Sequence, residues 1–350
     1  MLRFIIWGFF RRKGIDLKWI INSKEHEITE AYYQADCIIG CGGGYINDNY
    51  KPAILGRLFN LWFGKFLGKP VMIYAQSLGP FNTRFYRFLS RCVFDRIDLI
   101  ITRDVISKNI LEDIGVTKTQ IYANADAAIL LEPARGNKTE EILDDLGLNK
   151  KDKPIIGITV RKWTFGFENS AEVNERFMRK IAKFADYQVE SNKFSVVFFS
   201  TPISKGNYYA TDMDTVDEIV SMMKYKEKVK SIINNYSPEE LKRICGQMDI
   251  VIGTRMHSLI LSSTMGVPVI GIAYEFKIRD YLESIGQEKY LCEFDNVTFE
   301  VLRDIVDNIW ENKDEIKREI AINVKKLEEK ALKNADLCAK LIRNEQNTYN

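Results

Sequence analysis

Residues 249–275 read DIVIGTRMHSLILSSTMGVPVIGIAYE, and this stretch decides the fold class. The runs at 249–253 and 267–273 are short, continuous and rich in Ile and Val, which is typical of parallel strands buried on both faces. A helix is predicted between them, at about 257–265. Strand, helix and strand in this order form the repeating unit of an α/β fold.

The same alternation recurs on both sides of this stretch. Strands are expected at 36–40, 70–75, 99–102, 155–160 and 194–200, and helices at 55–68, 82–96, 104–114, 170–190, 237–246 and 276–285. A charged helical tail is expected at 298–343. The chain has 350 residues, about twice the length of a usual domain. We therefore predict two doubly wound α/β domains facing across a cleft, at 1–150 and 151–350, the second ending in the helical tail.

Composition and charge exclude several classes of protein. The chain has 50 basic and 48 acidic residues, a balance that does not favour a nucleic acid as partner. No apolar run reaches the roughly 18 to 20 residues that a membrane span requires. Six cysteines without a CxxC pair favour neither a zinc site nor a disulfide framework, so a reducing cytoplasm is expected. The opening MLRFIIWGFFRRKG leaves two interpretations open, a core element and a membrane-surface anchor.

Candidate functional residues of the second half follow its strands. In doubly wound sheets ligands bind beyond the carboxyl ends of the strands, which points to Arg255 and His257 after one strand and Lys277 after the next. Arg binds carboxylate or phosphate with its planar fork, and His exchanges protons near neutral pH. The three together predict a positive pocket for a small, doubly charged anion. The alternatives are a buried core histidine and a solvated lysine at a helix start. The chain's other histidine, His26, is expected to face solvent.

Candidate residues of the first half also follow strands. Gly42, Gly43 and Gly44 let a backbone approach an anion closely, although a plain tight turn explains them equally well. Gln76 and Ser77 suit a sugar hydroxyl or a phosphate. Arg103 suits an anionic substrate, and its alternative is a structural ion pair with a neighbouring carboxylate. Arg84, Arg87 and Arg91 share one face of the helix at 82–96. That face is either solvated or a surface for an anionic or lipid-linked acceptor.

Five segments in one order resemble the polysaccharide pyruvyl transferase family. They are ADCIIGCGGGYI (35–46), QSLGP (76–80), ITRDVIS (101–107), NADAA (124–128) and GTRMHSLILSSTMGVPVIGIAYEFK (253–277). The likeness spans about residues 30 to 285, and the last segment is its most specific part.

The resemblance implies a GT-B-like fold and the transfer of a pyruvyl group from phosphoenolpyruvate to a sugar or lipid-linked oligosaccharide, as a cyclic ketal. The histidine and arginine of the family's G-x-R-x-H motif fall on His257 and Arg255. Lys277 matches a downstream lysine, and Arg103 a further anion-binding arginine. His257 is then the catalytic residue, and Arg255, Lys277 and Arg103 hold the donor. No metal or cofactor is expected beyond the co-substrate, and the enzyme is expected in the cytoplasm or at the inner face of the membrane.

One departure from the family concerns the N-terminal domain. The family begins with a strand, a loop resembling Asn-x-Gly-Asp and a helix, whereas only about forty residues precede Gly42 here and contain no such loop. The first βαβ element is expected to be shortened or lost, which affects acceptor binding. Two alternative functions stay open: a GT-B nucleotide-sugar glycosyltransferase, for which Glu275 is the candidate ribose-binding acid, and an inactive glycan-binding relative.

Overall fold

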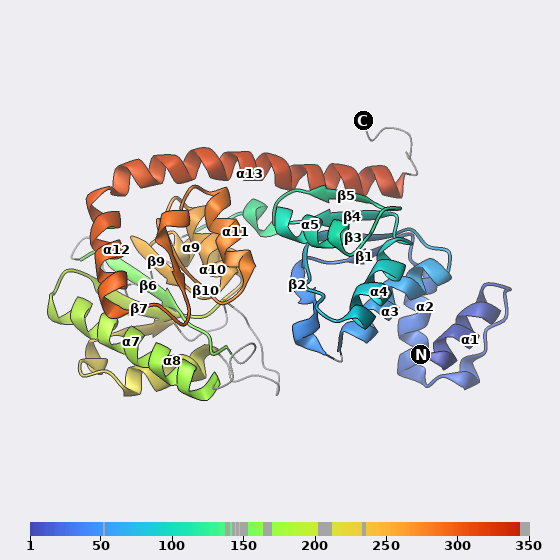
Figure 1. Cartoon of the computed structure of the whole chain (residues 1–350), viewed down its shortest axis with the longest axis horizontal. Helices are drawn as coiled ribbons and strands as arrows, with labels where there is room; N and C mark the ends of the chain where they lie inside the picture. Colours follow the sequence, from blue (N-terminus) through green and yellow to red (C-terminus); the bar gives the residue numbers. More distant parts are fainter. Residues whose placement is uncertain are drawn as a thin grey trace. The chain divides into compact units, whose positions relative to one another are not determined.

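The computed structural model describes residues 1–343 except 52, 137–140, 142–143, 145–146, 148–152, 164–169, 202–211 and 233–235. These residues form two compact units (Figure 1). The first unit comprises Met1–Ala127 and the end of the chain from Glu329, and the second comprises Ala128–Glu328. The boundary expected at residue 150 lies outside the described residues. The end of the tail, expected with the second domain, belongs to the first unit.

The first unit is a parallel sheet in the order β1-β3-β4-β5, and β2 also pairs with β3. Strands β1 and β2 therefore follow one another along the same edge of β3, with Ile38–Gly40 beside Val71–Ile73 and the next segment beside Gln76. The strands are β1 (Ile38–Gly40), β2 (Gly43–Ile46), β3 (Val71–Leu78), β4 (Leu99–Thr102) and β5 (Gln120–Ala123). The helices are α1 (Leu2–Arg11), α2 (Ser23–Gln34), α3 (Ala53–Phe66), α4 (Arg84–Phe94) and α5 (Val105–Asp113).

The helices of the first unit cover its sheet unevenly. Helices α3, α4 and α5 share one apolar core with the strands, which includes Leu58, Phe94 and Leu111. On the other face, Met72, Leu99 and Ile101 pack against Leu341, near the end of the chain. The described part of the sheet thus winds in one direction only, and helices, not a strand, precede β1.

The N-terminal helices pack on α3. Trp7 of α1 is fully buried and lies in a small core with Ile21, Phe63 and Leu67, as the core-element interpretation expects. Leu2 and Phe9 of the same helix are exposed, which leaves the apolar surface of α1 only partly covered. Among the described residues, no helix is both long and apolar enough to cross a bilayer.

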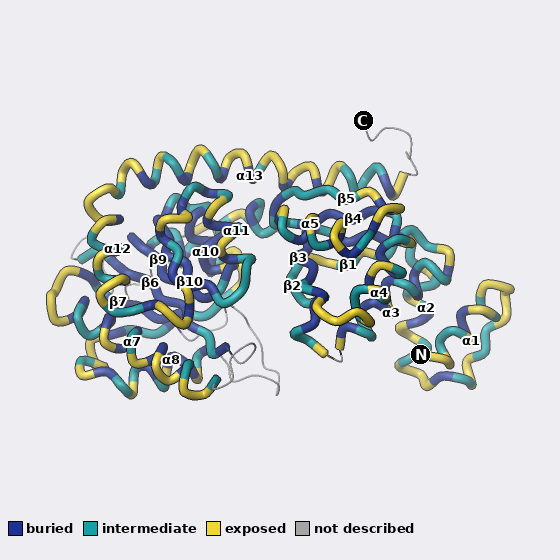
Figure 2. The backbone as a smooth tube through the Cα atoms, in the orientation of Figure 1, coloured by how far each residue is buried: buried dark blue, intermediate teal, exposed yellow. Residues whose placement is uncertain are grey.

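The second unit is a doubly wound parallel sheet in the order β11-β10-β9-β6-β7-β8. The chain starts at the centre with β6, adds β7 and β8 on one side, and then adds β9, β10 and β11 on the other. The strands are β6 (Ile155–Thr159), β7 (Ser195–Phe199), β8 (Lys230–Ile232), β9 (Ile250–Gly253), β10 (Val269–Ala273) and β11 (Leu291–Glu293). Strands β6, β7, β9 and β10 are almost entirely buried (Figure 2), as their continuous apolar runs predict.

The helices of the second unit begin at sequence signals that the chain supplies. Ser237 and Glu240 form a capping box at α9, with Pro238 at the first helical position, as predicted. The helices are α7 (Ser170–Glu190), α8 (Asp212–Ser221), α9 (Pro238–Cys245), α10 (Met256–Ser263), α11 (Phe276–Ser284), α12 (Phe299–Glu311) and α13 (Lys313–Ile342). Helix α13 starts in the second unit and ends in the first.

Candidate active site

The topological switch point of the second sheet lies between β6 and β9, where the direction of winding reverses. A crevice opens at the carboxyl ends of strands at such a point, and ligands of doubly wound sheets bind there. Arg255 and His257 directly follow β9, so they lie beyond the carboxyl end of a strand, as predicted from the sequence. Lys277 follows β10, the neighbour of β9 on the other side.

The turn after β9 is fixed to β6 by close packing and hydrogen bonds. A Cβ on Gly253 would lie 2.6 Å from Ser258 Oγ and 3.0 Å from Thr159 Oγ1, so the turn has room for glycine alone. The Thr159 and Ser258 hydroxyls are 2.7 Å apart, and Ser258 Oγ donates to the Arg255 carbonyl at 2.6 Å. The backbone that carries Arg255 and His257 is therefore rigidly placed against the central strand.

Arg255 occupies the N-cap position of α10, and its guanidinium binds a buried carboxylate. Nε donates to Asp212 Oδ2 at 2.8 Å and Nη2 donates to Oδ1 at 2.5 Å. The Asp212 side chain is 2% exposed and that of Arg255 is 23% exposed. Among the described residues, the third nitrogen, Nη1, has no acceptor. The pair thus holds the arginine in one orientation and leaves one donor for a ligand.

His257 is exposed in the first turn of α10. The alternative of a buried core histidine is therefore wrong. His26, in contrast, was expected to face solvent and does not: its side chain is 21% exposed. Its Nε2 lies 3.1 Å from Asp16 Oδ1, and its ring meets that of Trp7 edge to face.

Lys277 lies in the first turn of α11 and pairs with Glu275, with Nζ 2.6 Å from Oε2. Its side chain is 14% exposed, so it is not a solvated helix start. Arg255 and Lys277 each carry a carboxylate partner, which the prediction of a purely positive pocket did not include. The reason is physical, since a cation shielded from water needs a counter-charge or a ligand to be stable.

Aromatic side chains connect the loops that follow β6 and β10. The rings of Trp163 and Tyr274 stack at 4.1 Å, and Arg161 lies over both rings at 5.3 and 5.9 Å. Lys277 Nζ lies 5.6 Å from the centre of the Tyr274 ring. Asn174 holds the backbone of Trp163 through two hydrogen bonds of 2.8 and 2.7 Å. The two loops that flank β9 are thereby joined beside its carboxyl end.

In the first unit the structure brings the predicted residues together at the start of β2 and near the carboxyl ends of β3 and β4. Gly43 pairs with Gln76, and Gln76 pairs with Thr102. Arg103 Nε donates to Ser77 Oγ at 2.8 Å, and a Cβ on Gly44 would lie 3.3 Å from Arg103 Nη2. Gly42 precedes β2, where an added Cβ would meet the Ala75 carbonyl oxygen at 3.1 Å.

Arg103 itself is 5% exposed and forms an ion pair with Asp126, with Nη1 2.6 Å from Oδ2. The geometry favours the structural interpretation of Arg103 that the sequence left open. Ser77 Oγ also donates a hydrogen bond to Asp104 at 2.5 Å. Asp104 caps the N-terminus of α5, as predicted for an acidic residue at that position.

Several residues of these sites were missed by the sequence interpretation. Asp212 lies far along the chain from Arg255, and nothing local marks it as a partner. Arg161 and Trp163 directly follow the buried strand β6, and this position after a strand could have identified them as candidate site residues. Among the described residues, Asp16, His26 and Glu30 form one cluster of potential metal ligands within 4.8 Å. Their bonds to Trp7 and Arg11 explain the cluster without a metal.

Comparisons with known proteins agree with this architecture. Residues 2–275 match the family model described as polysaccharide pyruvyl transferase. The chain is 23% identical over 321 residues to the amylovoran biosynthesis protein AmsJ of Erwinia amylovora, covering 91% of this chain and 75% of AmsJ.

Two solved structures show a similar fold. HepE of Anabaena in complex with UDP-glucose has a TM-score of 0.57 at 12% identity, over 90% of this chain and 81% of HepE. A putative UDP-N-acetylglucosamine 2-epimerase of Listeria monocytogenes has a TM-score of 0.56 at 15% identity, over 84% and 71% of the two chains. Both likenesses concern the fold, which is GT-B-like, as expected.

Proposed function

The chain belongs to the polysaccharide pyruvyl transferase family, and on this basis we propose that it transfers a pyruvyl group from phosphoenolpyruvate to a sugar of a surface or exopolysaccharide precursor. A general role as a transferase in polysaccharide biosynthesis follows from the family and from the similarity to AmsJ. The observation that carries the finer proposal is the position of Arg255, His257 and Lys277 at the ends of two neighbouring strands beside the switch point.

The proposed reaction forms a cyclic ketal across two sugar hydroxyls. A proton adds to the methylene carbon of the enol and makes it a methyl group. The first hydroxyl oxygen attacks the adjacent carbon, the bond from that carbon to the phosphate oxygen breaks, and the second hydroxyl oxygen closes the ring. Of the two hydroxyl protons, one balances the proton gained by the methyl group and the other leaves with phosphate.

We assign the proton transfer to His257, because its imidazole is exposed just beyond a strand end and histidine is the most frequent general acid and base of enzymes. Arg255 and Lys277 are assigned to the carboxylate and phosphate of the donor. Nη1 of Arg255, which has no acceptor in the described part of the chain, and the ordering of both cations by Asp212 and Glu275 support this role. Arg103 is assigned to the architecture of the first unit, because its guanidinium is committed to Asp126 and Ser77. The scheme requires no metal ion.

The acceptor sugar is assigned to the strand ends of the first unit. Gly42, Gly43 and Gly44 offer backbone groups without side chains, and Gln76 lies on the neighbouring strand, where it is buried. The Ser77 hydroxyl, proposed from the sequence for the same role, is bonded to Arg103 and Asp104, so the backbone and amide groups are the ones that suit the hydroxyls of a sugar.

The two alternatives have weaker support. A glycosyltransferase would use Glu275 for a ribose, but this carboxylate is bound to Lys277. An inactive relative would be favoured by a His257 buried away from solvent, whereas His257 is exposed.

The test is phosphate release from phosphoenolpyruvate in the presence of lipid-linked or nitrophenyl sugars. His257→Ala is expected to lower kcat by about 10²- to 10⁴-fold, the range of a lost general acid. The matched control is His26→Gln, which removes the chain's other histidine and is expected to keep the activity. Unchanged phosphate release by His257→Ala contradicts the assignment. Release of UDP from UDP-sugars, with no phosphate from phosphoenolpyruvate, supports the glycosyltransferase instead.

A further inference from the structure

Residues 49–94, which include α3, β3 and α4, contain seven Lys or Arg and no Asp or Glu. Elsewhere in the chain acidic residues outnumber basic ones, 48 to 43, so the bias is local. Lys51 and Lys65 of this stretch pair with Asp48 and Asp98, which lie just outside it. Of the arginines on α4, Arg87 pairs with Asp113 and Arg91 with Asp95, whereas Arg84 is exposed and has no acidic partner among the described residues.

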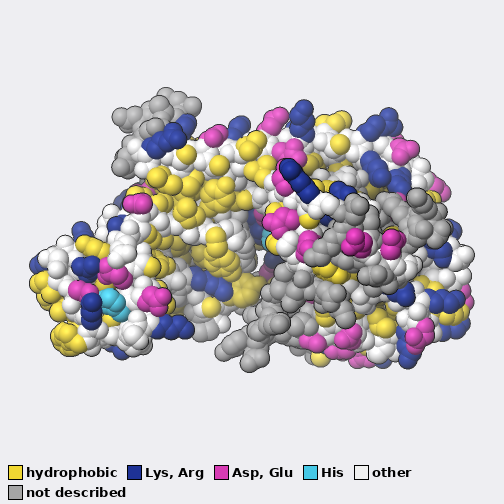
Figure 3. Space-filling view, turned by 180° about the vertical axis from the view of Figure 1, so that it is seen from behind, with side chains coloured by type: hydrophobic (Ala, Val, Ile, Leu, Met, Phe, Trp, Pro, Cys, Tyr) yellow, Lys and Arg dark blue, Asp and Glu magenta, His cyan; other side chains and the backbone are white. Residues whose placement is uncertain are grey.

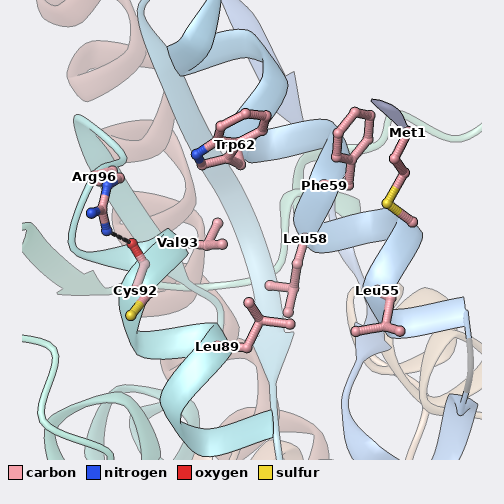
Figure 4. Close-up of a pocket in the computed structure, with 9 residues that line it drawn as sticks. All are labelled: Met1, Leu55, Leu58, Phe59, Trp62, Leu89, Cys92, Val93 and Arg96. Atoms are coloured by element: carbon pink, nitrogen blue, oxygen red, sulfur yellow. Dashed lines mark hydrogen bonds between the residues drawn. The ribbon is translucent and has the colours of Figure 1, made fainter. Parts of the chain in front are cut away.

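An apolar pocket of about 380 Å³ lies between these two helices (Figure 4). Helix α3 contributes four side chains and helix α4 contributes three, and Met1 and Arg96, which follows α4, complete the wall. The lining residues are Leu55, Leu58, Phe59, Trp62, Leu89, Cys92, Val93, Arg96 and Met1. The Arg96 guanidinium donates to the Cys92 carbonyl at its margin, so the charge sits at the edge of an otherwise apolar hollow.

The apolar surface continues beyond the pocket along α4. Phe85 and Phe88 precede the lining residues Leu89 and Cys92 by four positions each, which places all four on one face of the helix. Phe85 is 60% exposed and Phe88 is 67% exposed, although large aromatic side chains are normally covered.

The surface also continues toward the N-terminal helices. A second pocket of about 250 Å³ shares Met1 and Phe59 with the first and adds apolar side chains of α1, α2 and α3, among them Phe4 and Ile28. Its one acidic member, Glu25, forms an ion pair with Arg3. In the view from behind, hydrophobic side chains also gather on the surface of the first unit (Figure 3). An apolar area of this extent marks an interaction site.

We propose that this face of the first unit, formed by α3, α4 and the start of α1, docks onto the surface of an anionic lipid bilayer. Exposed aromatic rings enter the boundary between headgroups and acyl chains, and arginines beside them meet the anionic headgroups. The apolar pocket receives the end of an acyl chain. The exposed Arg84 beside Phe85 and Phe88 favours an anionic bilayer over a second copy of the chain, because two copies of this face would bring like charges together. The inference does not depend on the proposed transfer reaction, although a lipid-linked acceptor would be presented at the same surface.

The experiment is co-sedimentation of the full chain with vesicles of phosphatidylcholine alone or of phosphatidylcholine mixed with phosphatidylglycerol. The protein is expected to bind the anionic vesicles only, and the binding is expected to weaken as salt is added. The double variant Phe85→Ser, Phe88→Ser is expected to lose at least tenfold in affinity. Arg84→Gln is expected to lose about fivefold, the effect of one basic side chain near an anionic surface.

The matched control is Ile322→Ser, Leu332→Ser on α13, where the side chains are 60% and 56% exposed, like those of the two phenylalanines. This control is expected to bind vesicles within twofold of the wild type. Equal binding to both kinds of vesicle, no binding to either, or a Phe85, Phe88 variant that binds like the wild type overturns the proposal. The proposal is also overturned if the wild type self-associates without lipid and the Phe85, Phe88 variant does not. In that case the face binds a second copy of the chain. Unchanged phosphate release from a soluble acceptor shows that the variants leave the transfer reaction intact.

Discussion

Removing Arg255 is expected to destabilise the second unit because it leaves the Asp212 carboxylate buried without its cation. That side chain is 2% exposed and loses two charged hydrogen bonds, of 2.8 and 2.5 Å. Breaking one side of a buried pair costs about 3 to 5 kcal/mol. Arg255 is 23% exposed and water can enter, so Arg255→Ala is expected at the lower end, about 3 kcal/mol.

The double variant Asp212→Asn, Arg255→Ala separates this cost from any role of Arg255 in binding the donor. A neutral amide is cheaper to bury than a carboxylate, so the double variant is expected to regain about 1 to 2 kcal/mol of the loss. Phosphate release is expected to stay low in both variants, because neither has the guanidinium.

The free energies of unfolding would be measured by urea titration followed by circular dichroism, with the transition of the second unit analysed by itself. Arg179→Ala is the control, because Arg179 pairs with Glu175 on the surface of α7, where the two side chains are 64% and 53% exposed. Its expected effect is below about 0.5 kcal/mol. The reasoning is refuted if Arg255→Ala is as stable as the wild type, or if the double variant is no more stable than the single one.

Two further predictions concern pH and packing. The hydrogen bond from Arg11 lowers the pKa of Glu30 by more than burial raises it. Glu30 therefore stabilises the fold at pH values above its pKa in the unfolded chain, and this stabilisation is lost as the pH falls through its pKa in the folded protein. Glu30→Gln is thus expected to cost about 1 kcal/mol at pH 7 and nothing near pH 2, and an equal deficit at both pH values in urea titrations would contradict it. Gly253→Ala is expected to cost at least about 2 kcal/mol in the same titration, since its Cβ would lie 2.6 Å from Ser258 Oγ. Gly56→Ala, in a helix with open space around the added methyl group, is expected to gain about 0.5 to 1 kcal/mol, and equal effects of the two substitutions would count against the packing argument.

The central strands were predictable because they are buried on both faces and therefore carry unbroken apolar runs, as in β9 and β10. The short strands β2, β5, β8 and β11 were not predicted. They are three or four residues long and less completely buried, so their sequences, such as Lys230–Ile232, carry little apolar signal.

The same contrast applies to the candidate site. The positions of Arg255, His257 and Lys277 at strand ends follow from the alternation of strands and helices alone. Their counter-charges do not, because Asp212 meets Arg255 only through the tertiary fold. The environment of His26 was misjudged for a similar reason, since the charged sequence around it hides its contacts with Trp7 and Asp16.

The packing of Leu341 on Met72, Leu99 and Ile101 has a consequence for the order of synthesis. These strand residues are translated well before the helix end that covers them. The first unit therefore remains without one of its covering elements until α13 has been made. Contacts between such distant parts of a sequence form slowly, and an uncovered sheet face is prone to aggregate. The nascent chain is thus expected to depend on chaperones until translation reaches α13.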